Sequence, residues 1–210
     1  TVQIRWKGTR KMTVENILTI YKMATPEEKR DGIIWYAEAE AICKRMALKH
    51  DIPSRVVVGV AAALSPNNKW ERNIFNADDL IGAFLNGEDI DSVKVSTYHT
   101  MKRKAWSILE QMPDHDRIIS ILNGQKIVSF YRNIMGDDTC TVDGHARNIY
   151  YGERLGLTDD RTNIGKKEYS IISQAYVDAA KRTRANGRAL KAFELQAITW
   201  VVWRRIHNIT

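Results

Sequence analysis

The stretch that decides the fold spans residues 122–146 and reads LNGQKIVSFYRNIMGDDTCTVDGHA. A turn at Gly124 precedes a run with helical spacing, Ile127 to Ile134, and the free N–H groups at the start of such a helix form a natural seat for a phosphate. An irregular loop rich in Gly, Asp and Thr follows and delivers Asp143 to the edge of the next helix. On position alone, Asp143 is interpreted as an N-cap, because the helix dipole stabilises a carboxylate there.

The sequence on both sides of this stretch predicts helices from end to end. Thr25-Pro26-Glu27-Glu28 combines an N-cap, a Pro at the first helical position and a capping-box Glu, and it opens a helix that runs to about Lys49. We expect further helices at 56–64, from 76 to about 86, 100–112, 114–122, 127–134, 147–155, 168–184 and 188–207, with a strand conceivable only at 2–6. The chain is therefore predicted to be an all-α protein of about nine or ten short helices.

The composition of the 210 residues restricts the class of protein. Apolar residues make up 44% and charged residues 27%, so the chain can bury a core, and no apolar run is long enough to span a membrane. A formal net charge of +7 favours an anionic partner, of which nucleic acid is the commonest. Two cysteines, Cys43 and Cys140, cannot form a disulfide framework or a four-thiolate cluster, so we expect a reducing, cytoplasmic setting. The 5 histidines are scattered without ligand spacing, and we expect no metal site.

The order of features in residues 122–146 resembles that of the helix-hairpin-helix DNA glycosylase superfamily, the endonuclease III-like enzymes. In that family a hairpin carrying a Lys precedes a loop that ends in Val-Asp-x-His, and Val142-Asp143-Gly144-His145 looks like that element. Gly124-Gln125-Lys126 matches the hairpin's Gly-x-Lys, and residues 147–157, which end in Arg-Leu-Gly-Leu, are similar to the helix after the loop. The resemblance implies catalytic roles for Asp143 and Lys126.

Two upstream segments agree in order with this resemblance. Residues 60–67 (VAAALSPN) are similar to the family's buried helix and its Leu-Ser-x-Gln turn, whose polar residue enters the DNA stack, and Asn67 occupies that place. Residues 99–109, with Lys104-Ala105, resemble the short helix that precedes the family's hairpin. The likeness covers residues 56–157, about half of the chain.

The chain also departs from the family pattern. The family hairpin usually reads Leu-Pro-Gly-x-Gly, whereas Leu122-Asn123-Gly124 keeps only the second Gly, which alters the expected grip on phosphate. No four-cysteine iron–sulfur loop follows, so that variant of the family is not expected. The closing region has no counterpart in the family; Trp200 and Trp203, three residues apart, are predicted to be core rather than a surface on which bases stack. The composition of this region looks like that of phage-encoded members, and related phage proteins are thought to act on hypermodified thymidine.

The chemistry that the resemblance implies is cleavage of an N-glycosidic bond. This reaction develops positive charge on the sugar, so an ionised carboxylate near C1′ stabilises the transition state, and Asp143 is the candidate. Lys126 either contacts a phosphate or attacks C1′ to form a Schiff base that continues to strand cleavage. The target base must be flipped out of the duplex before either reaction.

Several further residues are predicted to contact DNA. Asn67 and Asn68 suit the space that a flipped base leaves, with Trp70 beside them as a wedge, although Pro-Asn-Asn is also ordinary turn chemistry and Trp70 equally suits a core. His145 either contacts a phosphate or packs behind Asp143, and the basic run 102–104 either follows the DNA backbone or is a solvated face. The predicted DNA-binding set is Asn67, Asn68, Lys69, Trp70, Lys102, Lys104, Gly124, Gln125, His145 and Arg147.

Three functions remain open from the sequence. The first is a DNA glycosylase, with or without lyase activity, acting on double-stranded DNA, modified phage DNA included. The second keeps the fold but decorates 5-substituted pyrimidines in phage DNA, with Asp143 activating an incoming amine or a phosphate leaving group. The third is a DNA-binding module without catalysis. For each we expect one compact, monomeric domain over residues 1–210 with two helical lobes and the hairpin and catalytic loop at about 118–147. No cofactor and no membrane contact are expected, and the location is the cytoplasm, that of a bacterial host if the gene is phage-encoded.

Overall fold

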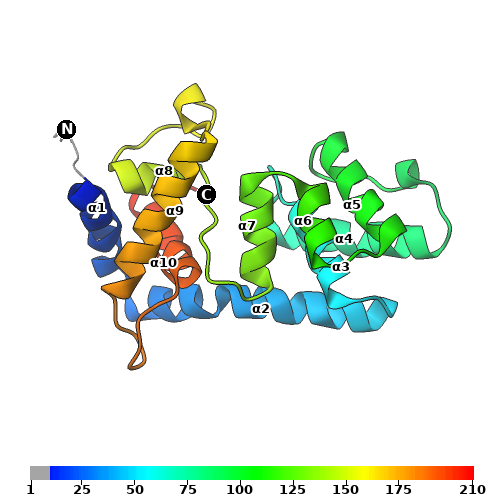
Figure 1. Cartoon of the computed structure of the whole chain (residues 1–210), viewed down its shortest axis with the longest axis horizontal. Helices are drawn as coiled ribbons and strands as arrows, with labels where there is room; N and C mark the ends of the chain where they lie inside the picture. Colours follow the sequence, from blue (N-terminus) through cyan, green and yellow to red (C-terminus); the bar gives the residue numbers. More distant parts are fainter. Residues whose placement is uncertain (1–9) are drawn as a thin grey trace. The chain divides into compact units, whose positions relative to one another are not determined.

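The structure, a computed structural model, describes residues 10–210, so the strand considered at 2–6 lies outside the described residues. Within this range the chain forms α-helices and two short 3₁₀-helices and no β-strand, which confirms the predicted all-α class (Figure 1). The elements are α1 (Arg10–Lys22), α2 (Pro26–His50), α3 (Ser54–Ala63), α4 (Trp70–Leu85), η1 (Ile90–Ser92), α5 (His99–Gln111), α6 (His115–Leu122), α7 (Gln125–Ile134), α8 (Gly144–Tyr151), η2 (Asp160–Thr162), α9 (Lys166–Lys181) and α10 (Ala192–Ile206). None of the helices in the described part of the chain is long and apolar enough to cross a membrane.

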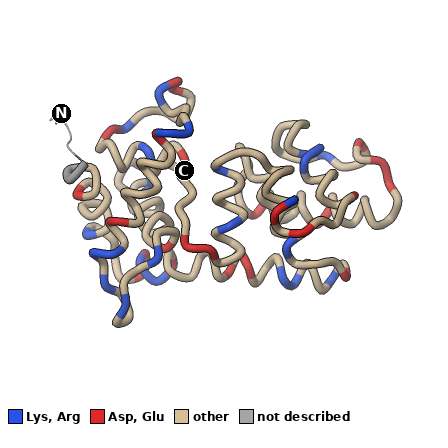
Figure 2. Tube along the Cα trace, in the orientation of Figure 1, with Lys and Arg blue, Asp and Glu red and all other residues tan. Residues whose placement is uncertain are grey.

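The helices divide into two compact units. Unit 1 holds the described residues up to Tyr36 together with Asp138–Thr210, and unit 2 holds Ala37–Asp137. Helix α2 contributes its first half to unit 1 and its second half to unit 2. In both units Lys and Arg are spread over several helices with Asp and Glu among them (Figure 2). The net charge of +7 is thus distributed over the chain.

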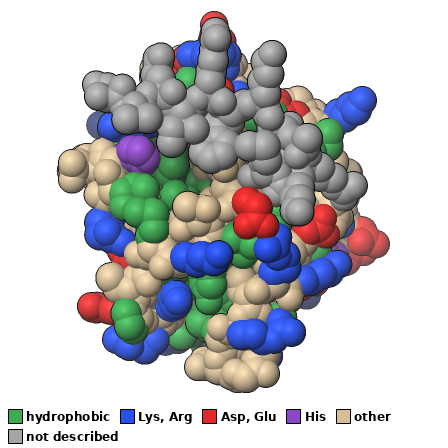
Figure 3. Space-filling view, turned by 90° about the vertical axis from the view of Figure 1, so that its left-hand side faces the viewer, with side chains coloured by type: hydrophobic (Ala, Val, Ile, Leu, Met, Phe, Trp, Pro, Cys, Tyr) green, Lys and Arg blue, Asp and Glu red, His purple; other side chains and the backbone are tan. Residues whose placement is uncertain are grey.

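Unit 1 is a bundle in which α1 packs against α8, α9 and α10. Its core includes Ile17, Ile172 and Leu195, each 0% exposed, together with buried polar side chains such as Gln196 and Thr199. Helix α2 approaches α10 closely at Gly32, where an added Cβ would lie 2.8 Å from Ile198 Cα. On the face of unit 1 that Figure 3 shows, Lys and Arg side chains lie between hydrophobic and acidic ones.

Unit 2 is built around α3, which contacts α4, α5, α6 and α7. The sequence of α3, SRVVVGVAAA, places a solid block of small and β-branched side chains at its centre, and residues 56–63 are all buried. Gly59 lets α6 approach, since an added Cβ would lie 3.0 Å from Ile118 Cγ2. The prediction of a buried helix rather than a strand at 56–64 is therefore confirmed.

Three predicted helix boundaries differ from the structure by four residues or more. Helix α4 begins at Trp70 and not at Asn76, because the Asn76 side chain does not cap a helix but accepts a hydrogen bond from Ser96 N at 3.0 Å. Helix α8 ends at Tyr151, since Gly152 takes the left-handed conformation (φ 68°) four residues before the Gly that was predicted to end it. Helix α10 begins at Ala192 rather than 188, where the Asp138 carboxylate accepts a hydrogen bond from the Ala192 N–H at 2.9 Å.

Candidate functional site

The loop that leads to Asp143, residues 138–143 of unit 1, is held by a buried tyrosine of α9. The Tyr169 hydroxyl accepts a hydrogen bond from Val142 N at 3.0 Å and donates one to Cys140 O at 3.3 Å. Tyr169 is 7% exposed, so both hydrogen bonds lie in the interior of the unit. One hydroxyl therefore fixes the backbone on both sides of Thr141 and sets the position from which Asp143 leaves the loop.

Two further buried tyrosines surround the start of α8. The Tyr176 hydroxyl donates to Ala146 O at 3.4 Å, and the Tyr36 hydroxyl donates to Gln196 Oε1 at 3.1 Å. Burial raises the pKa of Tyr36 well above its ordinary value, and the nearby charge of Asp143 raises it further. Burial raises the pKa of Tyr176 in the same way. Both hydroxyls therefore remain protonated at neutral pH and add no second negative charge beside Asp143.

The carboxylate of Asp143 caps α8, as its position in the sequence predicted. Its Oδ1 accepts a hydrogen bond from the Ala146 N–H at 2.8 Å. Among residues 10–210, Oδ2 has no hydrogen-bond donor within reach, and the side chain is half-buried. Glycine at position 144 avoids a close contact, because an added Cβ there would lie 2.7 Å from Leu157 Cδ2. One carboxylate oxygen thus fixes the group and the other is available.

The two candidates that follow Asp143 on α8 are buried. His145 is 9% exposed, and its ring meets the Trp200 ring edge-on at a centroid distance of 6.4 Å. Arg147 is 8% exposed, with its guanidinium stacked 4.5 Å from the centroid of the Tyr151 ring. Arg147 also lies 3.7 Å from a carboxylate oxygen of Glu153 and 3.7 Å from one of Glu168. Its charge is used inside unit 1, which argues against the predicted contact with DNA.

The residues of the predicted hairpin form α6, a two-residue turn and α7 in unit 2. Asn123 takes the left-handed conformation (φ 47°) at the end of α6, and Gly124 is the N-cap of α7 without a side-chain cap. An added Cβ at Gly124 would lie 3.2 Å from Ile127 Cγ1, so the turn favours glycine. Gln125 is half-buried and Lys126 is exposed. The hairpin thus presents uncapped backbone N–H groups next to a solvated amine.

The basic run on α5 does not form a row of free cations. Lys102 is 6% exposed and Arg103 Nε donates to His99 Nε2 at 2.9 Å. Lys104 Nζ donates to the carbonyl of Leu122, the last residue of α6. Lys104 therefore holds the hairpin rather than facing a phosphate, and neither predicted lysine of this run lies on an open surface.

The turn between α3 and α4 separates the paired asparagines. Asn67 is exposed in the left-handed conformation (φ 51°), and its amide donates to the Tyr98 hydroxyl. Asn68 instead donates to Leu64 O at 3.1 Å and to Asn76 Oδ1 at 3.2 Å, so it connects the turn to α4.

The two residues that follow also differ in exposure. Lys69 is exposed, while Trp70 is half-buried and packs edge-on against Phe130 at a centroid distance of 6.0 Å. From this turn Asn67 and Lys69 are therefore placed to meet a partner, whereas Asn68 serves the turn itself.

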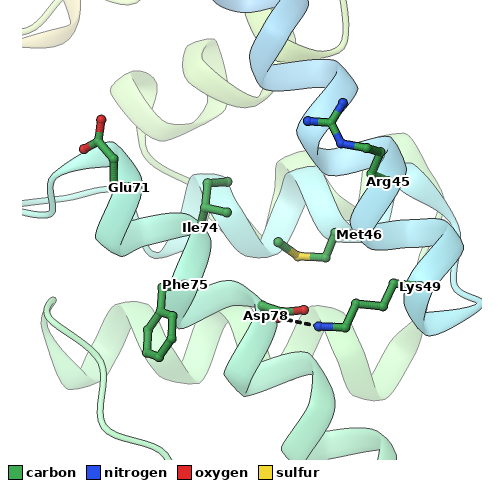
Figure 4. Close-up of a pocket in the computed structure, with 7 residues that line it drawn as sticks. All are labelled: Arg45, Met46, Lys49, Glu71, Ile74, Phe75 and Asp78. Carbon is green, nitrogen blue, oxygen red and sulfur yellow. Dashed lines mark hydrogen bonds and ion pairs between the residues drawn. The ribbon is translucent and has the colours of Figure 1, made fainter.

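A pocket of about 370 Å³ in unit 2 lies between α2 and α4 and contains none of the predicted residues (Figure 4). Its lining is Arg45, Met46, Lys49, Glu71, Ile74, Phe75 and Asp78. Both oxygens of Asp78 are paired, with Lys49 Nζ at 2.6 Å and with His50 Nε2 at 2.6 Å. Burial raises the pKa of Asp78, but the hydrogen bonds from Lys49 and His50 outweigh it and the pKa lies below its usual value. A carboxylate so fully paired offers no reactive oxygen, and Asp143 remains the better candidate.

The part of the chain that the structure describes contains no site suited to metal binding or to thiol chemistry. No group of three or more His, Cys, Asp or Glu residues there is arranged to hold a metal ion. Cys43 and Cys140 are both buried and free. Burial raises the pKa of the Cys43 thiol to about 12, so it remains protonated.

Sequence reasoning missed the tyrosines that support the loop. Tyr169 and Tyr176 lie seven residues apart on α9, one above the other on a single face. A buried Tyr hydroxyl needs a hydrogen-bond partner, and this spacing was the available signal that α9 carries polar atoms into the core. The partners themselves, in residues 138–146, are set by the tertiary fold and have no local pattern.

The chain matches the sequence pattern of a protein family over almost its whole length. The sequence pattern of a family described as Family of unknown function (DUF7178) matches residues 2–207. No curated protein and no solved structure matches the chain.

Proposed function

We propose that this chain, which belongs to the family of unknown function DUF7178, is a DNA glycosylase that removes a flipped, modified base from double-stranded DNA with Asp143 as the catalytic carboxylate. The observation that carries the proposal is the difference in hydrogen bonding between the two oxygens of that carboxylate. Oδ1 is fixed by the Ala146 N–H, while Oδ2 has no hydrogen-bond donor among the described residues. A cap requires one oxygen, and the second is free to face a developing positive charge.

In the proposed reaction the bond between C1′ and the base nitrogen breaks, and its electron pair leaves with the base. The sugar becomes positively charged, and the carboxylate of Asp143 stabilises that charge. A water molecule then adds to C1′ through its oxygen and gives up one proton, and the departing base takes up one. The products are a free base and an abasic site in the DNA.

The hydrogen bonds of the loop support this assignment. Electrostatic stabilisation is effective only when the charged group is already in position, because moving it during the reaction costs free energy. Tyr169 fixes Val142 and Cys140 just before Asp143, and the cap fixes the carboxylate itself. Asp143 therefore has the rigid support that such a role requires.

The hairpin and the turn after α3 supply the DNA contacts in this proposal. Lys126 is exposed, so nothing in unit 2 desolvates its amine, and a cationic contact with phosphate fits it better than nucleophilic attack. Asn67 and Lys69 are exposed at the other turn of unit 2 and suit contact with DNA. Hydrolysis rather than lyase chemistry is thus proposed.

The test is mass spectrometry of the small molecules that the protein releases from duplex DNA, using phage DNA with modified pyrimidines beside unmodified DNA of the same sequence. Free base without a covalent protein adduct after borohydride treatment is the expected result. An adduct that disappears in Lys126→Ala would replace hydrolysis with lyase chemistry. Release of pyrophosphate would indicate decoration of the base, and binding without any product would indicate a DNA-binding module; both results would contradict the proposal.

A further inference from the structure

One face of α10 carries three side chains that no part of the fold fully uses. Gln196, Trp200 and Arg204 are spaced four residues apart, so they lie in a row along one side of the helix. We call this row the α10 stripe. Gln196 is 7% exposed, and Trp200 and Arg204 are half-buried. The stripe therefore runs from the interior of unit 1 toward its surface.

The α10 stripe adjoins Asp143 at two points within unit 1. The ring of Trp200 meets the ring of His145, two residues after Asp143, at a centroid distance of 6.4 Å. Gln196 accepts the hydrogen bond of the Tyr36 hydroxyl at 3.1 Å. Asp143 lies close enough to Tyr36 for its charge to act on that hydroxyl. The stripe thus contacts two residues that adjoin Asp143, namely His145 and Tyr36.

Each member of the stripe keeps one functional group available. The amide nitrogen of Gln196 has no hydrogen-bond acceptor among residues 10–210. Trp200 exposes part of its ring, whereas Trp203, one turn away on the same helix, is 5% exposed. Trp200 therefore keeps part of its ring at the surface of unit 1, whereas Trp203 does not.

Arg204 differs from two other arginines of unit 1, Arg188 and Arg205, in having no carboxylate partner among the described residues. Arg188 pairs with Glu194 at 2.7 Å and Arg205 pairs with Glu28 at 2.6 Å. Arg204 has no carboxylate partner within the described chain; its Nε donates to Ile209 O at 3.3 Å, and its guanidinium lies 4.5 Å from the centroid of the Trp200 ring. The terminal nitrogens of Arg204 are thus free for an anion.

We infer that the α10 stripe is the nucleotide-recognition surface of the Asp143 site, and that it selects a base bearing a carbonyl group. The Arg204 guanidinium lies over the Trp200 ring, so the base would stack on the part of the indole that remains exposed, and the terminal nitrogens of Arg204 would bind the adjoining phosphate. The free N–H₂ of Gln196 donates to a carbonyl of the base, which favours keto bases such as thymine and its derivatives over adenine. This inference rests on the proposed function, because it names the substrate class of that site.

The test is a titration of the ¹⁵N-labelled full chain with thymidine 5′-monophosphate, followed through the indole N–H signals of its 6 tryptophans. Comparison with Trp200→Phe identifies the Trp200 signal. That signal is expected to shift and saturate with the nucleotide, with binding about tenfold weaker for deoxyadenosine 5′-monophosphate and for deoxyribose 5-phosphate, which lacks a base. An unmoved Trp200 signal, or equal binding of all three compounds, would overturn the inference.

Variants separate the three contributions. Trp200→Leu is expected to weaken binding of thymidine monophosphate about tenfold, while Trp200→Phe, which keeps an aromatic face, retains most of it. Arg204→Ala is expected to remove the advantage of thymidine monophosphate over thymidine, and Arg205→Ala, its matched control on the same helix, is not. Gln196→Glu, which replaces the donor with an acceptor, is expected to remove the preference over the adenine nucleotide. Unchanged binding in Trp200→Leu and Arg204→Ala would contradict the assignment.

The inference and the proposed function fail in different ways. If nucleotide binding depends on Trp200 and Arg204 but the protein releases no base from any DNA, the inference about the α10 stripe is supported and the proposed glycosylase function is contradicted. If Trp200→Leu releases base with an unchanged KM and the Trp200 signal does not move in the titration, the glycosylase function is supported and the inference about the α10 stripe is contradicted.

Discussion

Unit 1 buries tyrosine, threonine and glutamine side chains around one loop, whereas unit 2 is built around a buried helix of valine and alanine and exposes Asn67, Lys69 and Lys126 at or beside two of its turns. In unit 1 the hydroxyl of Tyr169 and the carboxylate of Asp143 are each fixed by backbone groups. In unit 2 Asn67 and Lys69 are exposed on the turn after the apolar α3, and Lys126 is exposed in the first turn of α7. Fixed polar groups in an interior suit chemistry, and solvated cations on turns suit contact with a polyanion. The comparison predicts that unit 1 variants change rates and unit 2 variants change affinity.

The largest effect is expected from Asp143→Asn in unit 1. Asparagine keeps the cap of α8, so stability changes by less than about 1 kcal/mol, but loss of the charge is expected to slow base release about 10²- to 10³-fold. Single-turnover base release and urea unfolding measure the two quantities. Asp138→Asn is the matched control, since that carboxylate also accepts a hydrogen bond from a helix N-terminus. Equal rates in the two variants would remove Asp143 from the chemistry.

The next effect is expected from Tyr169→Phe, which leaves the buried Val142 N–H without its acceptor. An unsatisfied buried donor costs about 1–3 kcal/mol of unfolding free energy. The displaced loop is also expected to lower the single-turnover rate about tenfold, because small misplacements of a catalytic group are costly. The control is Tyr21→Phe, a buried tyrosine of the same unit whose hydroxyl makes no hydrogen bond within residues 10–210. A stability loss without any change in rate would confine Tyr169 to folding.

A smaller effect, on affinity, is expected from Lys126→Ala in unit 2. Loss of one phosphate contact lowers the slope of log K against log salt by about 1 and weakens DNA binding several-fold. The rate at saturating DNA is expected to stay unchanged. Arg132→Ala, an exposed cation at the other end of α7, serves as the control in fluorescence anisotropy measurements at several salt concentrations. A large loss of rate at saturating DNA would show that Lys126 takes part in the reaction. It would contradict the predicted difference between the two units.

The smallest effect is expected from Asp78→Asn, in the pocket of unit 2. The pKa of Asp78 is lowered in the folded state, so its pairing stabilises the protein above the ordinary carboxyl pKa of 3.8 and is lost as the pH falls below it. The variant is expected to lose less than about 1 kcal/mol at pH 7, because the pair is partly exposed, and its difference from wild type is expected to shrink at pH 3, as the pH falls toward the lowered pKa of Asp78. Urea unfolding at the two pH values measures this, with the exposed neighbour Asp79→Asn as control. Reduced base release in Asp78→Asn would contradict the assignment of the pocket to stability.

Periodicity and capping patterns predicted nine of the ten α-helices of residues 10–210, because both signals are local, but they missed α1. Thr25 caps α2 as its capping box predicts, with Glu28 N donating to Thr25 Oγ1 at 3.1 Å, and the two-residue turn at Asn123 and Gly124 separates α6 from α7. The start of α4 was predicted incorrectly, because Asn76 resembles a cap in sequence but hydrogen-bonds Ser96 in the fold. Capping of α8 by Asp143 was predicted from position, whereas the support from Tyr169 depends on a contact 27 residues away in the chain. The burial of Lys102 and Arg147 was likewise invisible, because charge runs in a sequence do not show which side of a helix is covered.

The most direct test of the central claim uses DNA in which the target nucleotide is replaced by a pyrrolidine analogue, whose ring carries a positive charge where the reacting sugar would carry it. Wild-type protein is expected to bind this duplex at least about 100-fold more tightly than a duplex with the neutral tetrahydrofuran analogue, as proteins bind mimics of the states they stabilise. Asp138→Asn should retain that preference and Asp143→Asn should lose it. Equal binding of the charged and neutral duplexes by wild-type protein would contradict the account.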